Sequence, residues 1–441
     1  MLSIGILSMV GCAPQNSSEV NSNINPSNNG NTDSNSTKQT NSNSQPKINS
    51  VRLSVTLPVL DAMLFDDEFV NSLKTEAGLN DAEIEKLRNA SGEAVAQLGE
   101  DEKGSGSTRA AVKRAESKII ETVGNEKAEK LFQLINKKYS GELDPQTALS
   151  SKPNAIPSDT RIVVNAPAYR MDAFQDGKLI KTYKIGIGYP EFPLPEGLRK
   201  ADTIIFNPTW TPPDEPWVKG KYKPYRKVAA GSKSNPLGFI KIPIGLPSLI
   251  HGGKQAARLG NFASHGCVGL TNEQVQDFSL ILSQISGTTL TEDEIAGYQK
   301  NREETKNLEL AKTIPVELRY ETIVVENGKL RIYRDVYEHG TNTEDNLKKV
   351  LENYGVKFES LSEADRQNIL NSLAAMNTDA EGKTVDENAA NSNKSTDSNS
   401  DKTKNSEITS NIKGRKEIEI SIAQLEGKGY PAPANYNSGQ K

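Results

Sequence analysis

The stretch that says most about this chain reads ASHGCVGL and covers residues 263–270. It holds Cys267, one of the two cysteines of the chain, and His265, one of its three histidines. In an extended segment, residues two apart point to the same side, so His265 and Cys267 are expected to share one face. An imidazole beside a thiol can take its proton and keep the thiolate at neutral pH. The stretch therefore predicts Cys267 as a nucleophile and His265 as its general base and acid.

The residues around this pair are suited to the rest of an acyl transfer. Gly266 leaves room for a substrate carbonyl to approach the backbone, where amides can hold a developing oxyanion. His251, followed by two glycines, can face the same pocket. We expect His251, Ser264 and Gly266 to contact the substrate or the oxyanion. The run Thr271-Asn272-Glu273-Gln274 opens a helix directly afterwards and would fix the strand end that bears the nucleophile.

The composition excludes several classes of protein. A net charge of -4 over 441 residues argues against nucleic-acid binding, which usually needs a basic face. No apolar run approaches the ~20 residues of a membrane span. Residues 13–50 and 377–414 are polar and low in apolar content, so both tracts are expected to be disordered.

Residues 1–12 resemble the end of a bacterial lipoprotein signal. An apolar stretch leads to a small residue, Gly11, and then to Cys12, which would take a diacylglycerol. The segment lacks a basic start, and Met9 stands where leucine is usual. A lipid at Cys12 would anchor the protein to a membrane and place it outside the cytoplasm, in the cell envelope. A short apolar end with an incidental cysteine is the alternative.

The folded part reads as an α+β chain of several domains. Apolar residues spaced three and four apart predict a small all-α domain over 51–150, with a capping box that starts at Asn80 and a helix closed by Gly124. Near Asp159 the period changes to two, which predicts a mainly-β domain over 159–340 with a helical insertion at about 291–312. A helical segment at 341–376 and a C-terminal strand and tail at 415–441 complete the chain.

Two hairpins are expected in the β part. Asp176-Gly177 supplies the turn of the first, and Asn327-Gly328 joins a strand over 316–325 to a second over 330–333. Ile418, Ile420 and Ile422 alternate as a strand that can return to the sheet.

Taken together, these residues resemble the L,D-transpeptidase catalytic domain of the YkuD type. The family signature is a histidine, a spacer and then Ser-His-Gly-Cys; here it is His251, a spacer, and Ser264 to Cys267. Further landmarks agree in order: Asn207-Pro208-Thr209-Trp210, Pro212-Pro213, Asn235-Pro236-Leu237-Gly238 and Ile250-His251-Gly252. The resemblance covers about 159–290 and the hairpin at 313–337, which is under half the chain.

The resemblance implies a β-sandwich-like catalytic fold and a cysteine acyl-enzyme. Cys267 would attack the L-to-D bond of a peptidoglycan stem tetrapeptide and expel D-alanine. A second amine, from another stem or from a protein acceptor, would then take the acyl group. His265 would be the base, and His251 would orient the substrate or the oxyanion. Neither a metal nor a cofactor is implied.

One departure from the family pattern concerns activity. The family usually has arginine two residues after the cysteine, where this chain has Gly269. Because a guanidinium suits a carboxylate, its loss indicates weak activity, an altered donor, or replacement by a residue such as Arg258. Leu194-Pro195-Glu196-Gly197 is a second, smaller departure, since threonine commonly precedes that proline.

Several alternatives stay open from the sequence. A catalytically weak or inactive peptidoglycan-binding lipoprotein fits Gly269, and an L,D-carboxypeptidase would use water as the acceptor. His251, His265 and Cys267 also make a potential zinc set, although a fourth ligand is missing. A cell-wall cysteine endopeptidase needs its cysteine before its histidine, and the order here is the reverse. His339, in a polar run, is expected to be a solvated loop residue.

Overall fold

The computed structural model describes residues 52–98, 106–141, 152–212, 223, 226–380, 382–385 and 414–435. The predicted signal at 1–12, the lipidation residue Cys12 and the polar tract 13–50 lie outside these residues, as does most of the tract 377–414. Its first residues, however, are ordered, because Thr378 pairs with Thr384 and Val385 is buried. No helix in the described part of the chain is long and apolar enough to cross a membrane.

The described chain begins with helices, as the periodicity predicts. They are α1 (Leu57–Met63), α2 (Asp67–Thr75), α3 (Asp81–Ala96) and α4 (Thr108–Ser140). The capping box at the start of α3 is confirmed, because Asn80 Oδ1 accepts from the Glu83 amide and the Glu83 carboxylate accepts from the Asn80 amide, both at 2.9 Å. Gly124 interrupts α4 with a φ of +76°, so the helix bends there and continues. The apolar faces share one core, which includes Leu60, Phe69, Leu87, Ile119 and Ile135.

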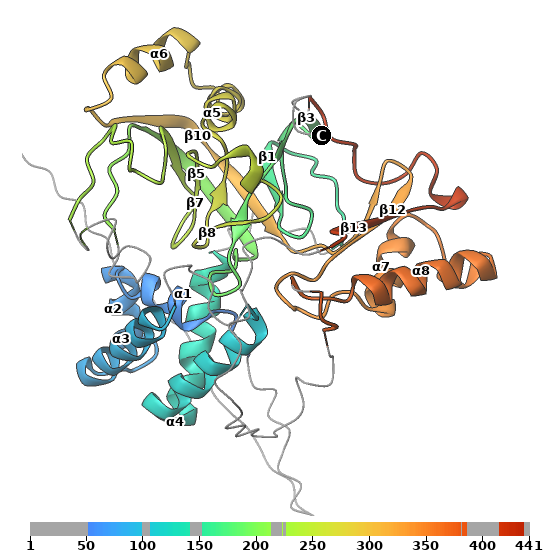
Figure 1. The fold of residues 1–441 in the computed structure, drawn as a ribbon, viewed down its shortest axis with the longest axis horizontal. Coiled ribbons are helices and arrows are strands. Elements are labelled where there is room, and N and C mark those ends of the chain that lie inside the picture. Colours follow the sequence, from blue (N-terminus) through green and yellow to red (C-terminus); the bar gives the residue numbers. More distant parts are fainter. Residues whose placement is uncertain are drawn as a thin grey trace, which may run out of the picture. The chain divides into compact units, whose positions relative to one another are not determined.

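A mixed sheet of eight strands follows, in the order β3-β2-β1-β10-β5-β6-β7-β9 (Figure 1). Its strands are β1 (Arg161–Asn165), β2 (Arg170–Gln175), β3 (Lys178–Lys184), β5 (Gly197–Phe206), β6 (Ile240–Pro243), β7 (Leu249–His251), β9 (Val268–Gly269) and β10 (Lys306–Arg319). The short strands β4 (Ile187–Gly188) and β8 (Phe262–Ser264) pair separately in parallel. The predicted fold class, a mainly-β catalytic region preceded by a small all-α region, is confirmed.

The hairpin between β2 and β3 forms at the predicted turn. Gln175 pairs with Lys178, so the loop has two residues, Asp176 at φ +48° and Gly177 at φ +78°. Positive φ at both positions is what a tight hairpin turn with the twist of its strands requires, and aspartate followed by glycine tolerates it best.

Helix α5 (Asn272–Ser286) lies across one face of the sheet, against β10, β6 and β2 (Figure 1). Its capping box is confirmed: Thr271 Oγ1 accepts from the Gln274 amide, and Gln274 Oε1 accepts from the Thr271 amide. The predicted apolar face, Val275, Phe278, Leu282 and Ile285, is buried in the core of the sheet. Because only Leu270 and Thr271 lie between β9 and α5, the N-terminus of the helix holds the end of that strand.

The predicted helical insertion at 291–312 is correct only in its first part. Helix α6 spans Glu292–Lys300, but residues from Lys306 onward belong to β10, where Lys306–Glu309 pair with Thr203–Phe206 of β5. The segment is rich in lysine, glutamate, leucine and alanine, which favour helix when nothing else decides. Pairing with β5 overrides that preference, as cross-strand contacts often do.

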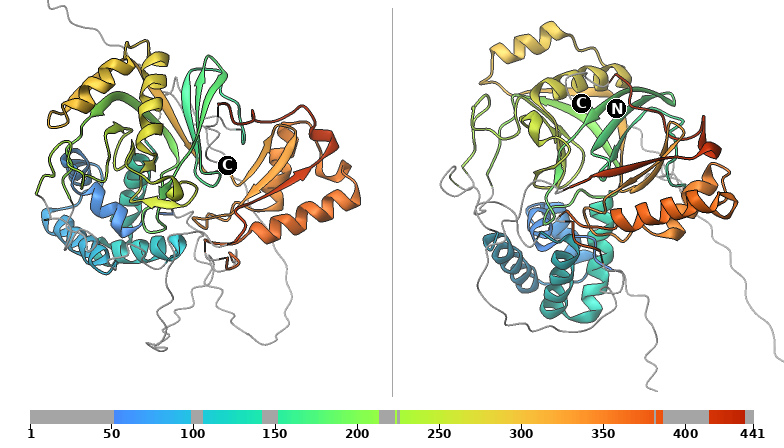
Figure 2. Two further views of the ribbon diagram at one scale, coloured as in Figure 1. Left: turned by 45° about the horizontal axis from the view of Figure 1, so that its top comes forward. Right: turned by 45° about the vertical axis from the view of Figure 1, so that its right-hand side comes forward.

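The second predicted hairpin lies in a different sheet. Strands β11 (Ile323–Glu326) and β12 (Lys329–Tyr333) pair across Asn327-Gly328 as expected, and β13 (Glu417–Ser421) adds to β12. Residues Val316–Arg319, predicted as the start of the same hairpin, pair with β1 and β5 instead. Helices α7 (Glu344–Asn353) and α8 (Glu363–Met376) cover this three-stranded sheet and share its core (Figure 2). The hairpin therefore belongs with the C-terminal helices rather than with the catalytic sheet.

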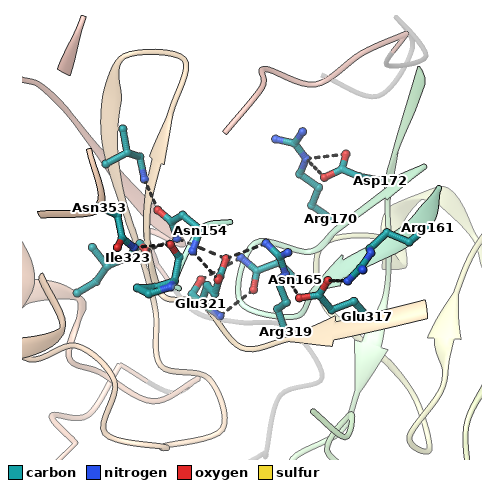
Figure 3. A network of polar contacts seen from close by, with 12 residues as sticks. Asn154, Arg161, Asn165, Arg170, Asp172, Glu317, Arg319, Glu321, Ile323 and Asn353 are labelled. Atoms are coloured by element: carbon teal, nitrogen blue, oxygen red, sulfur yellow. Dashed lines mark hydrogen bonds and ion pairs between the residues drawn. The ribbon is translucent and has the colours of Figure 1, made fainter. Parts of the chain in front are cut away.

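A buried polar network links the two sheets (Figure 3). Arg161 pairs with Glu317 at 2.7 Å, and Glu317 pairs with Arg319 at 2.8 Å. Arg170 of β2 pairs with Asp172 in its own strand and with Glu326 of β11 in the other sheet. Asn154 joins the same region by accepting from the Val325 amide and donating to the Ile323 carbonyl. Nothing in the spacing of these residues along the sequence indicates the network.

Candidate active site

Cys267 lies in a sharp turn between β8 and β9. Ser264 at the end of β8 closes that turn, because its Oγ accepts from the Cys267 amide at 3.1 Å and donates to the Cys267 carbonyl at 2.5 Å. Gly266 has a φ of +81°, a left-handed conformation that favours glycine. The Gly266 carbonyl accepts from Ser248 Oγ at 2.7 Å. Ser264, predicted to contact substrate or oxyanion, thus uses its buried hydroxyl to shape the turn that presents the thiol.

The extended geometry predicted for residues 265–267 is not adopted. The left-handed Gly266 turns the chain between His265 and Cys267, so the rule that residues two apart share a face does not apply here. The His265 ring packs edge-on against Phe192 at 4.7 Å between ring centres, and lies 5.4 Å from Tyr189. The surroundings of His265 are therefore largely aromatic.

His251 approaches Cys267 through strand register instead. Strand β7 runs parallel to β9, with Ile250 opposite Val268 and His251 opposite Gly269. Cys267 directly precedes β9, and the parallel register continued by one residue sets it beside Leu249, two residues before His251. The pairing of β7 with β9 therefore sets Cys267 next to the strand that bears His251.

The His251 ring is oriented by the backbone. Nδ1 lies 2.7 Å from the Gly252 carbonyl oxygen, and Nδ1–H donation to that carbonyl leaves Nε2 as the basic nitrogen. Asn272, the first residue of α5, braces the same segment, because its Oδ1 accepts from the Gly253 amide at 3.0 Å. The helix that the capping box predicts therefore also positions His251.

Burial and nearby charge keep His251 neutral. His251 is 3% exposed, and burial together with the positive charge of Lys254 lowers its pKa to about 3. The carbonyls of Gly252 and Leu237 act in the opposite direction, because they accept hydrogen bonds best from a protonated ring. At neutral pH the ring is uncharged and can accept a proton, and the same carbonyls would stabilise the imidazolium that results.

The thiol of Cys267 is also neutral at rest. Cys267 is the free cysteine of the described residues and is partly exposed, yet burial of its thiol raises the thiol pKa. A hydrogen bond with the Leu249 backbone and the positive charges of Lys254 and Lys241 limit that rise. A protonated thiol beside a neutral imidazole suits proton transfer during attack rather than a stable ion pair beforehand.

Two of the family landmarks have structural roles in loops. Asn207 adopts a φ of +47° and donates to the Tyr298, Asn301 and Glu304 carbonyls. Asn235 donates to the Pro208 carbonyl and accepts from the Leu237 amide. Pro213 of the Pro212-Pro213 landmark lies outside the described residues. The two asparagines therefore build loops and do not point to chemistry of their own.

The loop over 189–195 carries contacts that the sequence did not reveal. Its aromatic residues Tyr189 and Phe192 pack on His265, while hydroxyl groups from the helices hold its backbone. Thr56 Oγ1 donates to the Glu191 carbonyl at 2.6 Å, Thr108 Oγ1 donates to the Pro190 carbonyl at 2.8 Å, and the Tyr139 hydroxyl donates to the Pro193 carbonyl. Thr56 and Thr108 are buried at the starts of helices, where a threonine in the sequence predicts a helix cap and not a contact with a distant loop.

The remaining predicted groups are placed as follows. Arg258, suggested as a substitute for the missing arginine, donates to the Tyr189 hydroxyl at 2.7 Å. His339 is an exposed loop residue, as predicted, with Nδ1 3.0 Å from Glu196 Oε1 and its ring 4.1 Å from that of Tyr320. Within the described residues, no three histidine, cysteine or carboxylate side chains gather closely enough to hold a metal ion.

The region that contains these residues is similar to known proteins. Residues 159–284 match the model of the YkuD family, the L,D-transpeptidase catalytic domain. Over 170 residues the chain is 26% identical to YqjB of Bacillus subtilis (strain 168), a proposed L,D-transpeptidase, and the match covers 37% of this chain and 89% of that protein.

Two solved structures have low similarity. The catalytic domain of the E. faecium L,D-transpeptidase is 17% identical with a TM-score of 0.24, and the match covers 37% of this chain and 100% of that one. The Ldtfm–avibactam carbamoyl enzyme is also 17% identical with a TM-score of 0.24, and the match covers 36% of this chain and 49% of that one. Residues 159–284, which include Cys267, His265 and His251, are thus similar to the YkuD-type L,D-transpeptidase catalytic domain.

Proposed function

We propose that this chain is a cell-wall L,D-transpeptidase that works through a Cys267 acyl-enzyme. One observation carries the proposal: β7 pairs in parallel with β9, the strand directly after Cys267, with His251 opposite Gly269 and its Nδ1 2.7 Å from the Gly252 carbonyl oxygen. The stem tetrapeptide of peptidoglycan is the proposed donor. The family match supports the reaction type, and the geometry supports the choice of residues.

In the proposed first step, the thiol of Cys267 attacks the carbonyl carbon of the L-to-D amide bond. Its proton passes to Nε2 of His251, and the Gly252 carbonyl at Nδ1 then stabilises the imidazolium. The carbon–nitrogen bond breaks, and the leaving nitrogen of D-alanine takes the proton from His251. The product is a thioester on Cys267 and free D-alanine.

In the second step, an acceptor amine attacks the thioester carbonyl. His251 removes a proton from the attacking nitrogen and returns it to the sulfur as the carbon–sulfur bond breaks. A diamino acid of another stem as acceptor gives a cross-link, and a protein amine gives an attached protein. Water as acceptor would make the enzyme an L,D-carboxypeptidase.

We assign the base to His251 in place of His265. His265 remains the alternative, because it is close to Cys267 in sequence. The left-handed Gly266 and the aromatic packing of His265 favour a role in holding the turn.

The test is to incubate the wild type and Cys267→Ala with a disaccharide-tetrapeptide and to follow the products by mass spectrometry. The expected result is D-alanine release and dimer formation by the wild type and neither product with Cys267→Ala. D-alanine release without dimers would indicate the carboxypeptidase. Sacculus binding with no release by the wild type would indicate the inactive binding lipoprotein and overturn the proposal.

We further propose that a lipid at Cys12 anchors the protein outside the cytoplasm, where its cell-wall substrate lies. Growth of the native host with an alkyne fatty acid should label the wild type in the membrane fraction and leave Cys12→Ser unlabelled. Equal labelling of the two forms would contradict the anchor without bearing on the catalytic proposal.

A further inference from the structure

The space beside Gly269 is filled by the side chain of another residue. A Cβ atom added to Gly269 would lie 2.9 Å from Cγ, 3.4 Å from Cδ and 3.1 Å from Cε of Lys254. The methylene stem of Lys254 therefore lies across Gly269, where a side chain of residue 269 would begin. The missing side chain at position 269 is what lets Lys254 lie there.

The backbone fixes where this lysine starts. The Lys254 amide donates to the Leu270 carbonyl at 3.0 Å, just past the end of β9. From there the stem passes over Gly269, two residues from Cys267 in sequence. The charge of Lys254 acts on both the Cys267 thiol and the His251 ring. Because Lys254 is half-buried, its ammonium is less free to move than one at an open surface.

A second lysine stands on the other side of His251. Lys241 of β6 lies directly opposite His251 of β7, and directly paired residues of two strands share one face. Its charge also acts on the Cys267 thiol. Two cations thus flank a thiol and an imidazole that are both uncharged at rest, which makes the face electrostatically suited to an anionic substrate group.

We infer that Lys254, laid across Gly269, binds a carboxylate of the donor substrate next to the scissile bond, with Lys241 as the second cation of that site. This inference rests on the proposed function, because the D-alanine that the stem tetrapeptide loses carries its carboxylate one carbon from the bond that breaks. An ammonium on a flexible stem meets a carboxylate as a point charge, without the fixed two-point geometry of a guanidinium. Lys254 is thus a specificity residue that this chain supplies from the segment after β7.

The first experiment needs no turnover. Cys267 is alkylated with iodoacetate, which carries a carboxylate, and in parallel with neutral iodoacetamide of nearly the same size. The ratio of the two rates cancels any change in thiolate fraction. Lys254→Gln is expected to lower the iodoacetate-to-iodoacetamide ratio about 10-fold, as a charged hydrogen bond would. Lys254→Arg should retain most of it.

Matched controls separate contact from the general field. Lys227 is exposed and close enough to act electrostatically on Lys241, so Lys227→Gln removes a nearby charge that does not reach over Gly269. It should leave the ratio within about twofold of the wild type. An equal loss in Lys227→Gln and Lys254→Gln, or no loss in Lys254→Gln while its thermal unfolding is unchanged, would overturn the inference.

A swap of positions gives the second experiment. The variant carries Gly269→Arg in the Lys254→Ala background, so that a new cation enters the vacated space. It should restore about half or more of the decrease in the logarithm of the iodoacetate-to-iodoacetamide rate ratio. With tetrapeptide donors, Lys254→Ala should raise KM about 10- to 100-fold for the free acid and have little effect on the D-alaninamide form. No turnover of either donor by the wild type would sink the proposed function while the alkylation ratio still tests Lys254.

Discussion

The two histidines near Cys267 have different surroundings. His251 has a carbonyl at Nδ1 and lies on β7, which pairs with the strand after Cys267, whereas the His265 ring packs against Phe192 and Tyr189. We expect His251→Asn to slow acylation by a tetrapeptide or a carbapenem about 100- to 10,000-fold, since a positioned base contributes that much. His265→Asn should cost less than about 10-fold. Stopped-flow acylation of both variants checks this, and the reverse ranking would return the base to His265.

The depressed pKa of His251 has a consequence for stability in acid. Its folded pKa of about 3 lies below the ordinary value of 6.5, so between these values the unfolded chain binds a proton that the fold does not. This contribution is present above pH 6.5 and is lost as pH falls toward 3. Between pH 7 and pH 5 it amounts to about 2 kcal/mol.

Urea unfolding of the wild type and His251→Asn at both pH values measures this term. The wild type should lose about 2 kcal/mol more than the variant on acidification, because all other titrating groups are common to both. Equal losses would mean that His251 is solvated in the fold.

The pKa of Cys267 predicts how its reactivity depends on pH. Burial raises the pKa of this thiol above its ordinary value of 9.0, so the thiolate fraction of the free protein is small at neutral pH. The iodoacetamide rate should therefore still increase above pH 9 and be slower at pH 7 than that of a small unperturbed thiol. A plateau reached below pH 8 would instead indicate a stable thiolate–imidazolium pair.

At the scale of elements, the loop over 189–195 connects the helices to the catalytic turn. Tyr139→Phe removes the hydroxyl that holds the Pro193 carbonyl, and we expect a loss of about 1 kcal/mol in the free energy of unfolding. Because Phe192 of that loop packs on His265, kcat should also fall, about three- to tenfold. Ser72→Ala removes an exposed hydroxyl bonded within α2 and should change neither value. Equal kcat in the two variants would show that the loop holds its position without Tyr139.

The elements that the sequence predicted well are those defined by neighbours along the chain. The turns at Asp176-Gly177 and Asn327-Gly328 and the caps at Asn80 and Thr271 depend on residues a few positions apart, and all four are present. The start of β10 was missed because its partner, β5, lies about a hundred residues earlier and its own composition favours helix. Local patterns cannot report a pairing of that range.

The same division holds within the site. The motif identified Cys267, His265 and His251 from their order in the chain. It misjudged how the first two relate, because a single left-handed residue, Gly266, changes the direction of two side chains. Lys254 was not found, since its relation to Gly269 exists only once β7 and β9 pair in parallel. Strand pairing thus decided what residue spacing alone left open.

At the scale of the whole described chain, buried charge links two sheets, and Figure 3 shows part of this network, including Arg170 and Asp172. Arg170 is 8% exposed and pairs with Asp172 and Glu326, which lie in different sheets. Arg170→Met leaves both carboxylates buried without that cation, and we expect a loss of about 3–5 kcal/mol. Lys329→Met breaks a more exposed pair with Glu419 and should cost less than about 1 kcal/mol. Urea unfolding compares them, and equal costs would contradict a structural role for the network.

The position of Lys254 across Gly269 also constrains how this site can change by mutation. A side chain at residue 269 meets the lysine stem at Cγ, near its root, so the stem cannot yield as easily as a free tip would. If arginine replaces glycine at position 269 during evolution, the mutation of Lys254 is therefore expected to come first. The intermediate variant then has neither cation. The two positions are thus coupled, and the effect of a mutation at one depends on the residue present at the other.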